Sequence, residues 1–320
     1  MRPAAYFCLL LMLLLPMGRT TSQEPILIEC PELTECSGMA VSPSDSSLVW
    51  AHNDSGHLAR LYLLHRATGA LRGMVQLEGV SNGDWEDICA VQIAGKNYLA
   101  IGDTGDNHRR RDRVQIHLLE EPITDTIDDE AVQSVPQAGI TVQKVRQVLT
   151  LDISFPGGSV DCEGLAYDGA NKRFVLVTKE FLRCRVCAVP FQDAWLNALA
   201  AISEVGNGLS DGDNRSSTQP GALFPIVQAE HIQSLLVPLV TAADIRTEDQ
   251  MLALCTYGPA YLLQPDGLRW KERSMQRIAL PGRKQGESLA FAGSDELVIS
   301  SEHPPAPLWN LRIAKPASQP

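Results

Sequence analysis

The sequence predicts an all-β fold, a β-propeller, on three observations. A strand that opens with a small or acidic residue is followed about fifteen residues later by a strand with a polar end, and this pair occurs five times. Further strands bounded by turn residues lie between the pairs, which makes four strands per repeat. The last repeat lacks one strand, and one unassigned strand precedes the first repeat. Together these features predict sheets arranged in a closed ring.

The five pairs define where polar residues gather. They are residues 37–40 with 50–54, 86–89 with 101–103, 163–166 with 177–180, 243–245 with 254–257, and 287–290 with 299–302. Within a pair the second strand returns antiparallel to the first, so both polar ends lie at the same side of the sheet. A ring of such sheets brings these ends to one mouth. In the fourth repeat Ala243 replaces the opening acid, so we expect one wall of the mouth to carry less charge.

The number of blades follows from the spacing of the repeats. The second and third gaps are much wider than the others, and each contains an insertion, near residues 120–137 and 191–221. Five blades are therefore favoured, although the wide gaps leave room for a sixth. Within the second insertion, residues 193–202 are expected to form a short helix.

Ring closure is predicted from the two ends of the repeat region. After Glu287 only three strands can be assigned, and residues 26–30 form an extra strand before the first repeat. If this N-terminal strand completes the last sheet, no sheet edge stays open.

The first 22 residues have the features of a secretory signal peptide. Arg2 precedes an apolar run from Tyr6 to Leu15, and Pro16 then interrupts it. The run is too short to span a bilayer. We therefore expect residues 23–316 to form one propeller domain, secreted or periplasmic, and monomeric.

Charge and cysteine content narrow the function classes. The chain has a net charge of -11, and without the signal peptide 25 basic residues face 38 acidic residues, which gives -13. An acidic surface argues against nucleic acid as a partner and suits a bound cation or simple solvation.

Without Cys8 the cysteine count is odd, so at least one thiol is unpaired within the chain. Cys30 and Cys36 could form a disulfide or stay reduced, whereas most of the other thiols are expected to pack in the core.

Three motifs mark the mouth: Trp-Ala-His-Asn-Asp-Ser-Gly at 50–56, Asp-Trp-Glu-Asp at 84–87 and Gly-Asp-Thr-Gly-Asp-Asn at 102–107. With the strand-opening Glu-Gly-Leu-Ala at 163–166, they resemble a mostly uncharacterised group of secreted propellers. More distantly they resemble calcium-binding hydrolytic propellers, among them phytase-like esterases, lactonases and phosphotriesterases. The resemblance implies a ring of oxygen ligands for Ca²⁺ at the top of the channel. Its candidate members are Glu86, Asp103, Glu163, Glu180, Glu287 and Glu302, with Asn53 and Asp54.

Physical chemistry supports a cation there, and also offers a simpler interpretation. Carboxylates that converge on a narrow channel repel one another unless a cation or protons neutralise them, and Ca²⁺ accepts six to eight oxygen ligands in loose geometry. However, Asp, Asn, Ser and Gly are also typical of tight turns. We favour the turn interpretation for Ser55, Asp106 and Asn107, and the ligand interpretation for Glu86, Glu163 and Glu287 at strand openings.

Histidines and arginines near the mouth are the remaining candidates. His52, His108 and His303 lie at or just after strand ends, where one could act as a general base, although a lone histidine in a turn is more often solvated. The run at 108–113 holds Arg109, Arg110, Arg111 and Arg113, which could bind a substrate phosphate or pair with neighbouring acids.

The leading hypothesis is a secreted, calcium-dependent hydrolase of a phosphoester or carboxylic ester. The alternative is a propeller without enzymatic activity that binds an extracellular protein or glycan, with a structural metal only. Propellers support both kinds of function, so the fold alone does not decide between them.

Overall fold

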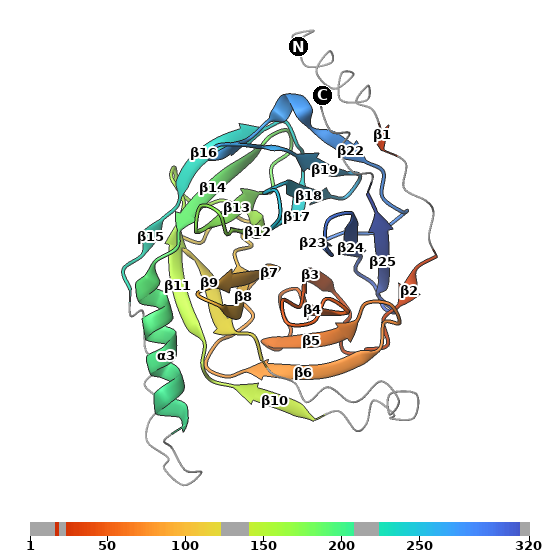
Figure 1. Ribbon diagram of the computed structural model, residues 1–320. Helices are drawn as coiled ribbons and strands as arrows, with labels where there is room; N and C mark the ends of the chain where they lie inside the picture. Colours follow the sequence, from red (N-terminus) through yellow and green to blue (C-terminus); the bar gives the residue numbers. More distant parts are fainter. Residues whose placement is uncertain (1–16, 19–23, 123–140, 208–223, 314–320) are drawn as a thin grey trace.

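The computed structural model describes residues 17–18, 24–122, 141–207 and 224–313, and these form a five-bladed β-propeller (Figure 1). Five sheets surround a central axis, each built on four antiparallel strands or, in the last blade, on three strands and the N-terminal strand. The innermost strands are β3 (Cys36–Val41), β7 (Trp85–Ile93), β12 (Cys162–Asp168), β17 (Val240–Ile245) and β23 (Ser288–Phe291). Each innermost strand contacts the next around the ring, and β23 contacts β3. The sequence-based prediction of a five-bladed propeller is confirmed.

The remaining strands complete each blade outwards. Blade 1 adds β4 (Leu48–Asn53), β5 (Arg60–His65), β6 (Leu71–Leu77) and the parallel strand β10 (Val142–Val145). Blade 2 adds β8 (Lys96–Asp103), β9 (Val114–Glu120), β11 (Leu149–Ser154) and the parallel strand β15 (Val227–Gln228). Blade 3 adds β13 (Arg173–Thr178), β14 (Cys184–Pro190) and β16 (Glu230–Leu235). Blade 4 adds β18 (Leu252–Thr256), β19 (Ala260–Leu263) and β22 (Gln276–Ile278). Blade 5 adds β24 (Glu296–Ser300), β25 (Pro307–Arg312) and β2 (Ile26–Leu27).

Three smaller elements lie outside this pattern. A two-stranded ribbon, β20 (Pro265–Asp266) with β21 (Arg269–Trp270), and the 3₁₀ turn η2 (Glu272–Ser274) extend blade 4. Strand β1 (Met17–Gly18) pairs in parallel with β22. It falls within the predicted signal peptide, most of which lies outside the described residues.

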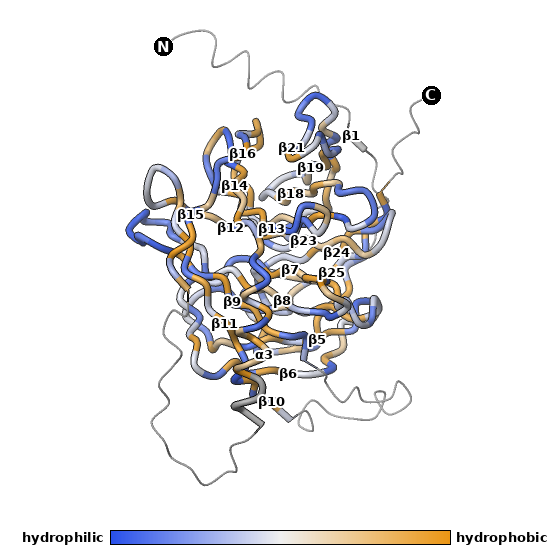
Figure 2. Tube along the Cα trace, turned by 60° about the vertical axis from the view of Figure 1, so that its left-hand side comes forward, coloured by the Kyte–Doolittle hydropathy of each residue, from blue (hydrophilic) through white to orange (hydrophobic). Residues whose placement is uncertain are grey.

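The hydrophobic core lies between neighbouring blades, because each sheet packs another sheet against both of its faces. Strands such as β4 and β13 are therefore buried along their whole length. Leu165, Leu176 and Val189 of blade 3 share one cluster with Ile116 and Leu151 of blade 2. The apolar colour of Figure 2 accordingly concentrates in the strands, and the hydrophilic colour in the connecting loops.

Strand β2 closes the ring, as the sequence predicts. Ile26 pairs with Leu308 of β25, and the Ile28 amide donates to the Ala306 carbonyl oxygen at 2.9 Å. The closing segment passes so close to Gly69 that a Cβ atom there would lie 2.3 Å from the Leu27 carbonyl oxygen. Gly69 also has a φ of +76°, so both the close approach and the backbone conformation require glycine.

The predicted helix in the second insertion is present as α3 (Asp193–Asn207) and is longer than the expected 193–202. It lies outside blade 2, near β11 and β15 in Figure 1. Trp195 and Leu199, four residues apart, are buried against the outer part of blades 2 and 3, and the Trp195 ring lies 5.3 Å from that of Phe191. This apolar stripe explains why the helix docks there. The expected insertion at 120–137 lies largely outside the described residues, as does the loop from 208 to 221.

All seven cysteines of the described residues are buried and unpaired, so Cys30 and Cys36 form no disulfide in this structure. Burial raises the pKa of the Cys30 thiol to about 11 and that of Cys36 to about 12. Both thiols therefore behave as small apolar groups in the first blade's core. No helix in the described part of the chain is long and apolar enough to cross a bilayer.

Candidate functional site

A β-bulge at the start of the innermost strands builds the mouth. In blades 1 to 4 the pairing register slips by one residue at the first rung, which leaves one residue without a partner. These bulge residues are Ser37, Glu86, Glu163 and Thr241, and Glu287 precedes β23 at the matching place in blade 5. A bulge redirects a side chain out of the ordinary alternation of a strand. The sequence-based alignment of the fourth repeat was wrong, because Thr241 rather than Ala243 occupies the position of the opening acid.

Glu86 lies at the centre of a cluster of carboxylates. One oxygen each from Asp54, Asp84 and Glu86 lie within 4.8 Å of one another. On its other side, Glu86, Asp161 and Glu163 form a second such group, and all three are buried. We call these five residues the carboxylate cluster. They come from blades 1, 2 and 3, so the ring itself brings them together.

Short loops hold the carboxylate cluster in place. Asn82 donates from its side chain to the carbonyl oxygen of Asp54 at 2.7 Å, which ties blade 1 to blade 2. The Asp106 amide donates to Asp161 Oδ1 at 3.0 Å, which ties blade 2 to the segment before β12. At Gly105 a Cβ atom would lie 2.0 Å from Glu86 Oε1 and 2.5 Å from Asp84 Oδ2. Glycine is therefore the residue that lets two acidic side chains approach this turn.

A second set of polar groups faces the carboxylate cluster from blades 3, 4 and 5. Lys179 forms an ion pair with Glu163 through Nζ and Oε1, and its ammonium group lies 5.0 Å from the centre of the Tyr257 ring. The Tyr257 hydroxyl donates to Glu287 Oε1 at 3.2 Å. Glu302 shares a hydrogen bond with Glu287. The mouth therefore continues from the carboxylate cluster through one lysine and one tyrosine to a second carboxyl pair.

Burial and mutual repulsion make these acids reluctant to ionise. Burial raises the pKa of Glu86 well above its usual range, and Glu163 and Asp54 add to the rise. Burial also raises the pKa of Asp84 to about 6 and, against the opposing effect of Lys179, that of Glu163 to about 8. For Glu302, burial and the hydrogen bond to Glu287 raise the pKa to about 9. Although burial opposes it, Glu163 raises the pKa of Lys179, which stays charged. Full ionisation of the cluster would create an excess of negative charge, which either bound protons or a cation would relieve.

Three of the predicted metal ligands lie outside the carboxylate cluster and bind other groups of the protein. Glu180 pairs with Arg185 at 2.8 Å and belongs to neither carboxylate group. Asn53 uses both ends of its amide for the backbone, accepting from Glu35 N at 2.9 Å and donating to the Glu32 carbonyl oxygen at 2.7 Å. These two bonds hold the Asn53 amide on the backbone of the segment before β3.

Asp103 is the third of these residues. It accepts from the amides of Gly83 and Asp84 at 3.0 and 3.2 Å and pairs with Arg111 at 2.7 Å. Against the effect of burial, His117 and Arg111 lower its pKa. It therefore positions the loop that carries Asp84 and is not itself a member of the carboxylate cluster.

The predicted histidines do not join the carboxylate cluster. His52 is fully buried beside Trp85, with ring centres 5.5 Å apart, and burial lowers its pKa to about 4. It is a neutral core residue and cannot reach a substrate in the mouth. His108 and His303 are exposed, and His303 has a φ of 85° in the loop before β25.

The basic run is partly used within the protein. The Asp106 carboxylate accepts from the amides of Arg110 and Arg111 at 2.8 Å each, so Asp106 is a turn residue, as expected. Arg111 is bound to Asp103, and Arg113 lies 3.5 Å from Asp152. Arg109 and Arg110 are exposed. The loop thus offers fewer free guanidinium groups than its sequence suggests.

Two further carboxyl groups, one buried and one partly buried, join neighbouring blades below the mouth. Asp87 is fully buried, and its Oδ2 accepts from the amides of Leu165 and Ala243, both at 2.9 Å, which joins the innermost strands of blades 2, 3 and 4. Asp244 Oδ2 accepts from the Phe291 amide at 2.7 Å, which joins blades 4 and 5. Burial raises the pKa of both groups, that of Asp244 to about 6.

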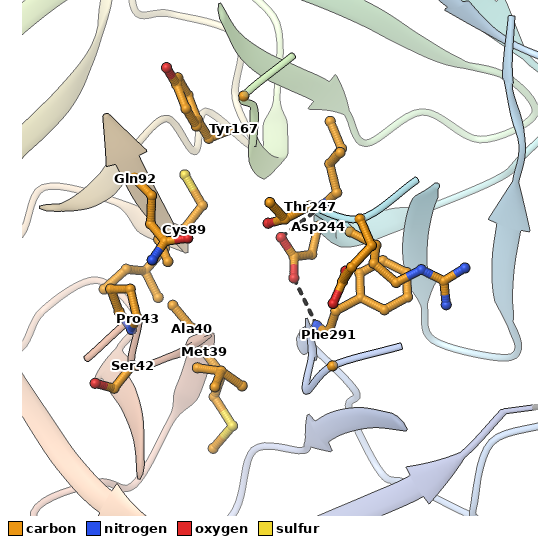
Figure 3. Close-up of a pocket in the computed structure, with 18 residues that line it drawn as sticks. Met39, Ala40, Ser42, Pro43, Cys89, Gln92, Tyr167, Asp244, Thr247 and Phe291 are labelled. Carbon is orange, nitrogen blue, oxygen red and sulfur yellow. Dashed lines mark hydrogen bonds between the residues drawn. The ribbon is translucent and has the colours of Figure 1, made fainter. Parts of the chain in front are cut away.

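A cavity of about 230 Å³ lies at the opposite end of the channel from the carboxylate cluster (Figure 3). Met39, Cys89, Tyr167 and Phe291 line it, from the later parts of four innermost strands. Three charged residues line it: Asp244 is bound to backbone amides, Arg246 pairs with Asp249, outside the lining, at 2.7 Å, and Glu248 is exposed to solvent. The mouth, with its unpaired acids, is therefore the better candidate for chemistry.

Sequence reasoning did not name Asp84, Asp161, Lys179 or Tyr257 as a site residue, although Asp84 belongs to the Asp-Trp-Glu-Asp motif. Asp161 lies two residues before the Glu-Gly-Leu-Ala motif at 163–166, and the acidic neighbour Glu180 was chosen instead of Lys179. Lys179 and Tyr257 occupy one shared position of the repeat, directly after the residue of the second strand that pairs with the residue before the bulge. The residues at this position, or at its equivalent in blade 5, are Asp54, Thr104, Lys179, Tyr257 and Glu302.

Comparison with known proteins supports no functional assignment for this chain. The chain is similar to the PQQ-bound aldose sugar dehydrogenase from Streptomyces coelicolor, with 11% identity, a TM-score of 0.46, and coverage of 93% of this chain and 99% of that one. It is also similar to XC5397 from Xanthomonas campestris, a gluconolactonase, with 11% identity, a TM-score of 0.45, and coverage of 94% and 99%. No protein-family model and no curated protein matches the chain.

Proposed function

We propose that the carboxylate cluster binds Ca²⁺ and that the protein is a secreted, metal-dependent ester hydrolase. One observation carries this proposal: Glu86, Asp161 and Glu163 are buried with their oxygens within 4.8 Å of one another, and Asp54 and Asp84 adjoin them. No backbone amide is seen to neutralise Glu86 or Glu163 among the described residues, in contrast to Asp87.

The donor set fits a hard cation. Glu86, Asp161, Glu163 and Asp54 each offer carboxylate oxygen, and these four with added water match the six to eight oxygen ligands of Ca²⁺, which leaves Asp84 free for another role. Cysteine and histidine, which favour zinc, are absent from both described groups. Bound there, the metal would act as a Lewis acid on an ester oxygen.

The chain's own residues suit the remaining tasks of ester hydrolysis. Asp84 is only partly buried at the edge of the carboxylate cluster, where it can accept a proton from an attacking water. The Tyr257 hydroxyl, which donates to Glu287 and is partly exposed, can donate to a substrate oxygen or a leaving group. These roles replace the general base that the sequence suggested at His52, His108 or His303.

The basic run at 108–113, here called the arginine loop, helps to decide between a phosphoester and a carboxylic ester as the substrate. Arg111 and Arg113 already pair with Asp103 and Asp152. A bidentate phosphate fork needs free guanidinium groups. Among the described residues of this loop, only Arg109 and Arg110 are exposed arginines that form no ion pair. We therefore favour a carboxylic ester, a lactone included, over a phosphoester.

The test combines metal analysis with a substrate panel. The purified mature protein is analysed for bound metal, then assayed on carboxylic esters, lactones and phosphoesters with and without chelator. We expect calcium-dependent turnover that Glu163→Gln reduces at least about tenfold. Glu180→Gln is the matched control, because Glu180 lies outside the carboxylate cluster and should leave turnover near wild type. Protein free of metal that gains no activity with Ca²⁺ would refute the proposal.

A second function is favoured by exposed apolar side chains on the mouth side. Leu58, Phe181 and Leu182, in loops that follow Asp54 and Lys179, are 62%, 78% and 53% exposed. Apolar groups on the rim of a polar site are typical of a surface that binds a partner. If the panel shows no metal-dependent turnover, binding of an extracellular protein or glycan becomes the better explanation. Loss of that binding in Phe181→Ser, with metal content unchanged, would support it.

A further inference from the structure

Lys179 stands out because it brings a positive charge into an acidic site. Among the described residues, it is the one basic side chain that forms an ion pair with the carboxylate cluster. Its side chain is 14% exposed, and its ammonium group lies between Glu163 Oε1 and the face of Tyr257. Glu163, its partner, is 2% exposed.

The fold does not require a lysine at this place. The matching position after the second strand is Asp54 in blade 1, Thr104 in blade 2, Tyr257 in blade 4 and Glu302 in blade 5. Four blades therefore reach the same backbone geometry with other residues. In blade 3 the positive charge of Lys179 serves as the counterion of Glu163.

We infer that Lys179 competes with the divalent cation for Glu163 and leaves that carboxylate when the metal binds. This inference rests on the proposed function, since it concerns the same site. The ammonium group and a metal held by Glu86, Asp161 and Glu163 would both neutralise the Glu163 carboxylate. Two cations at such short range repel each other strongly in a buried site. Lys179 is thus a positioning residue that sets how readily the mouth takes up metal.

The surroundings give the displaced side chain a place to go. Tyr257 is 39% exposed, and its ring face already contacts the ammonium group. A lysine stem is flexible and can keep the cation–π contact while its head turns towards water. The exchange therefore needs rotation of one side chain and no movement of the sheets.

The experiment measures calcium binding alone, by titration calorimetry, on the full mature chain. Lys179→Gln removes the charge and keeps a hydrogen-bond donor for Glu163, so we expect calcium affinity to rise at least about tenfold. Lys179→Arg keeps the charge and should bind calcium within about threefold of wild type. Lys179→Met is measured as a second neutral variant, and circular dichroism confirms that each variant is folded.

An independent readout follows the lysine itself. Acylation of lysine amines, read by mass spectrometry, should increase several-fold at Lys179 when calcium is added, because displacement from Glu163 exposes the side chain and lets it lose a proton to water and react as the neutral amine. Lys172, which is exposed far from the mouth, should not change.

The outcomes separate this inference from the proposed function. If wild type and both neutral variants bind no calcium, both ideas are overturned. If Lys179→Gln binds calcium and wild type does not, competition is supported while calcium dependence of the natural chain is refuted. If wild type and the neutral variants bind equally well and Lys179 labelling is unchanged by calcium, the inference alone is overturned.

Discussion

Glu86 and Asp87 are neighbours on one strand, both are buried, and yet their carboxyl groups have opposite surroundings. Asp87 accepts three backbone amide hydrogen bonds, from Ile88, Leu165 and Ala243. Glu86 faces other acids, and the bulge at the start of β7 turns it towards the mouth. The comparison shows that a buried carboxyl group with backbone amide donors stabilises the fold. A buried carboxyl group beside other carboxyl groups is instead suited to binding a cation.

The same contrast separates the two ends of the channel. Below the mouth, Asp244 joins blades 4 and 5 through the Phe291 amide, beside the cavity of Figure 3. At the mouth, Glu163 has Lys179 as its partner instead of an amide. An amide donor is fixed by the sheet, while a lysine side chain can move. The lower end of the channel is thus suited to structure and the mouth to exchange of ligands.

The largest effect is expected from removing the clamp at Asp87. Asp87→Ala leaves three buried amides without acceptors, and each such loss costs about 1–3 kcal/mol. We expect the free energy of unfolding to fall by at least about 3 kcal/mol, measured by urea denaturation. Asp87→Asn, which keeps one acceptor oxygen, should lose less. A loss below about 1 kcal/mol in Asp87→Ala would contradict the clamp.

Glu86→Gln should affect metal binding far more than the fold. In chelator, the variant is expected to unfold within about 1 kcal/mol of wild type, because a neutral amide replaces an acid that repels its neighbours. With calcium at about 100 times Kd, wild type should gain roughly 2.7 kcal/mol that the variant lacks. Thermal melts with and without calcium measure both quantities. An equal calcium-induced gain in the two proteins would exclude Glu86 from the site.

Asp244 should make the stability of the folded protein depend on pH. Its pKa rises from 3.8 to about 6 in the folded protein, so between these values the folded state binds a proton that the unfolded state releases. Stability therefore falls as pH rises through this window, by at most about 1.4 kcal/mol per unit from this group. Asp244→Asn should remove that slope. Parallel stability curves for the two proteins from pH 4 to pH 6 would show that Asp244 does not titrate there.

The smallest effect is expected at the arginine loop. Arg110→Ser removes an exposed guanidinium group and should change stability by less than about 0.5 kcal/mol. Arg111→Ser breaks the pair with Asp103 and should cost more, since Asp103 holds the loop that carries Asp84. Michaelis constants for a phosphoester and a carboxylic ester test the ligand role. A large increase for the phosphoester alone in Arg110→Ser would restore the phosphate hypothesis.

Much of the fold could be predicted from the sequence because its repeat is local. Turn residues and apolar strands gave four strands per blade, and the missing strand after Glu287 predicted closure by residues 26–30. The fourth repeat was misaligned because Ala243 and Asp244 imitate the small and acidic residues of a strand opening. A bulge adds one residue without changing the residue types, so only the pairing of Val240 and Ala242 with β18 reveals it.

The site was harder to predict because membership depends on which side chains point into the mouth. The strand-opening acids Glu86, Glu163 and Glu287 were found, since each carries charge at a position that turns do not need. Glu180 and Lys179 are adjacent, and composition favoured the acid, yet the structure pairs Glu180 with Arg185 and Lys179 with Glu163. Which of two neighbours enters the mouth depends on the pairing register, which the sequence alone did not reveal.

Closure by β2 also has a consequence for the order of assembly in time. Ile26 pairs with Leu308, so this contact cannot form until β25 has been synthesised. Blades 1 to 4 can pair their own strands earlier, while the edge of β25 waits for a partner from the far end of the chain. Joining such distant segments has a high loop entropy cost and slows folding. During that interval the free edge of one molecule can meet the β2 segment of another, so protein concentration should govern the yield of refolding.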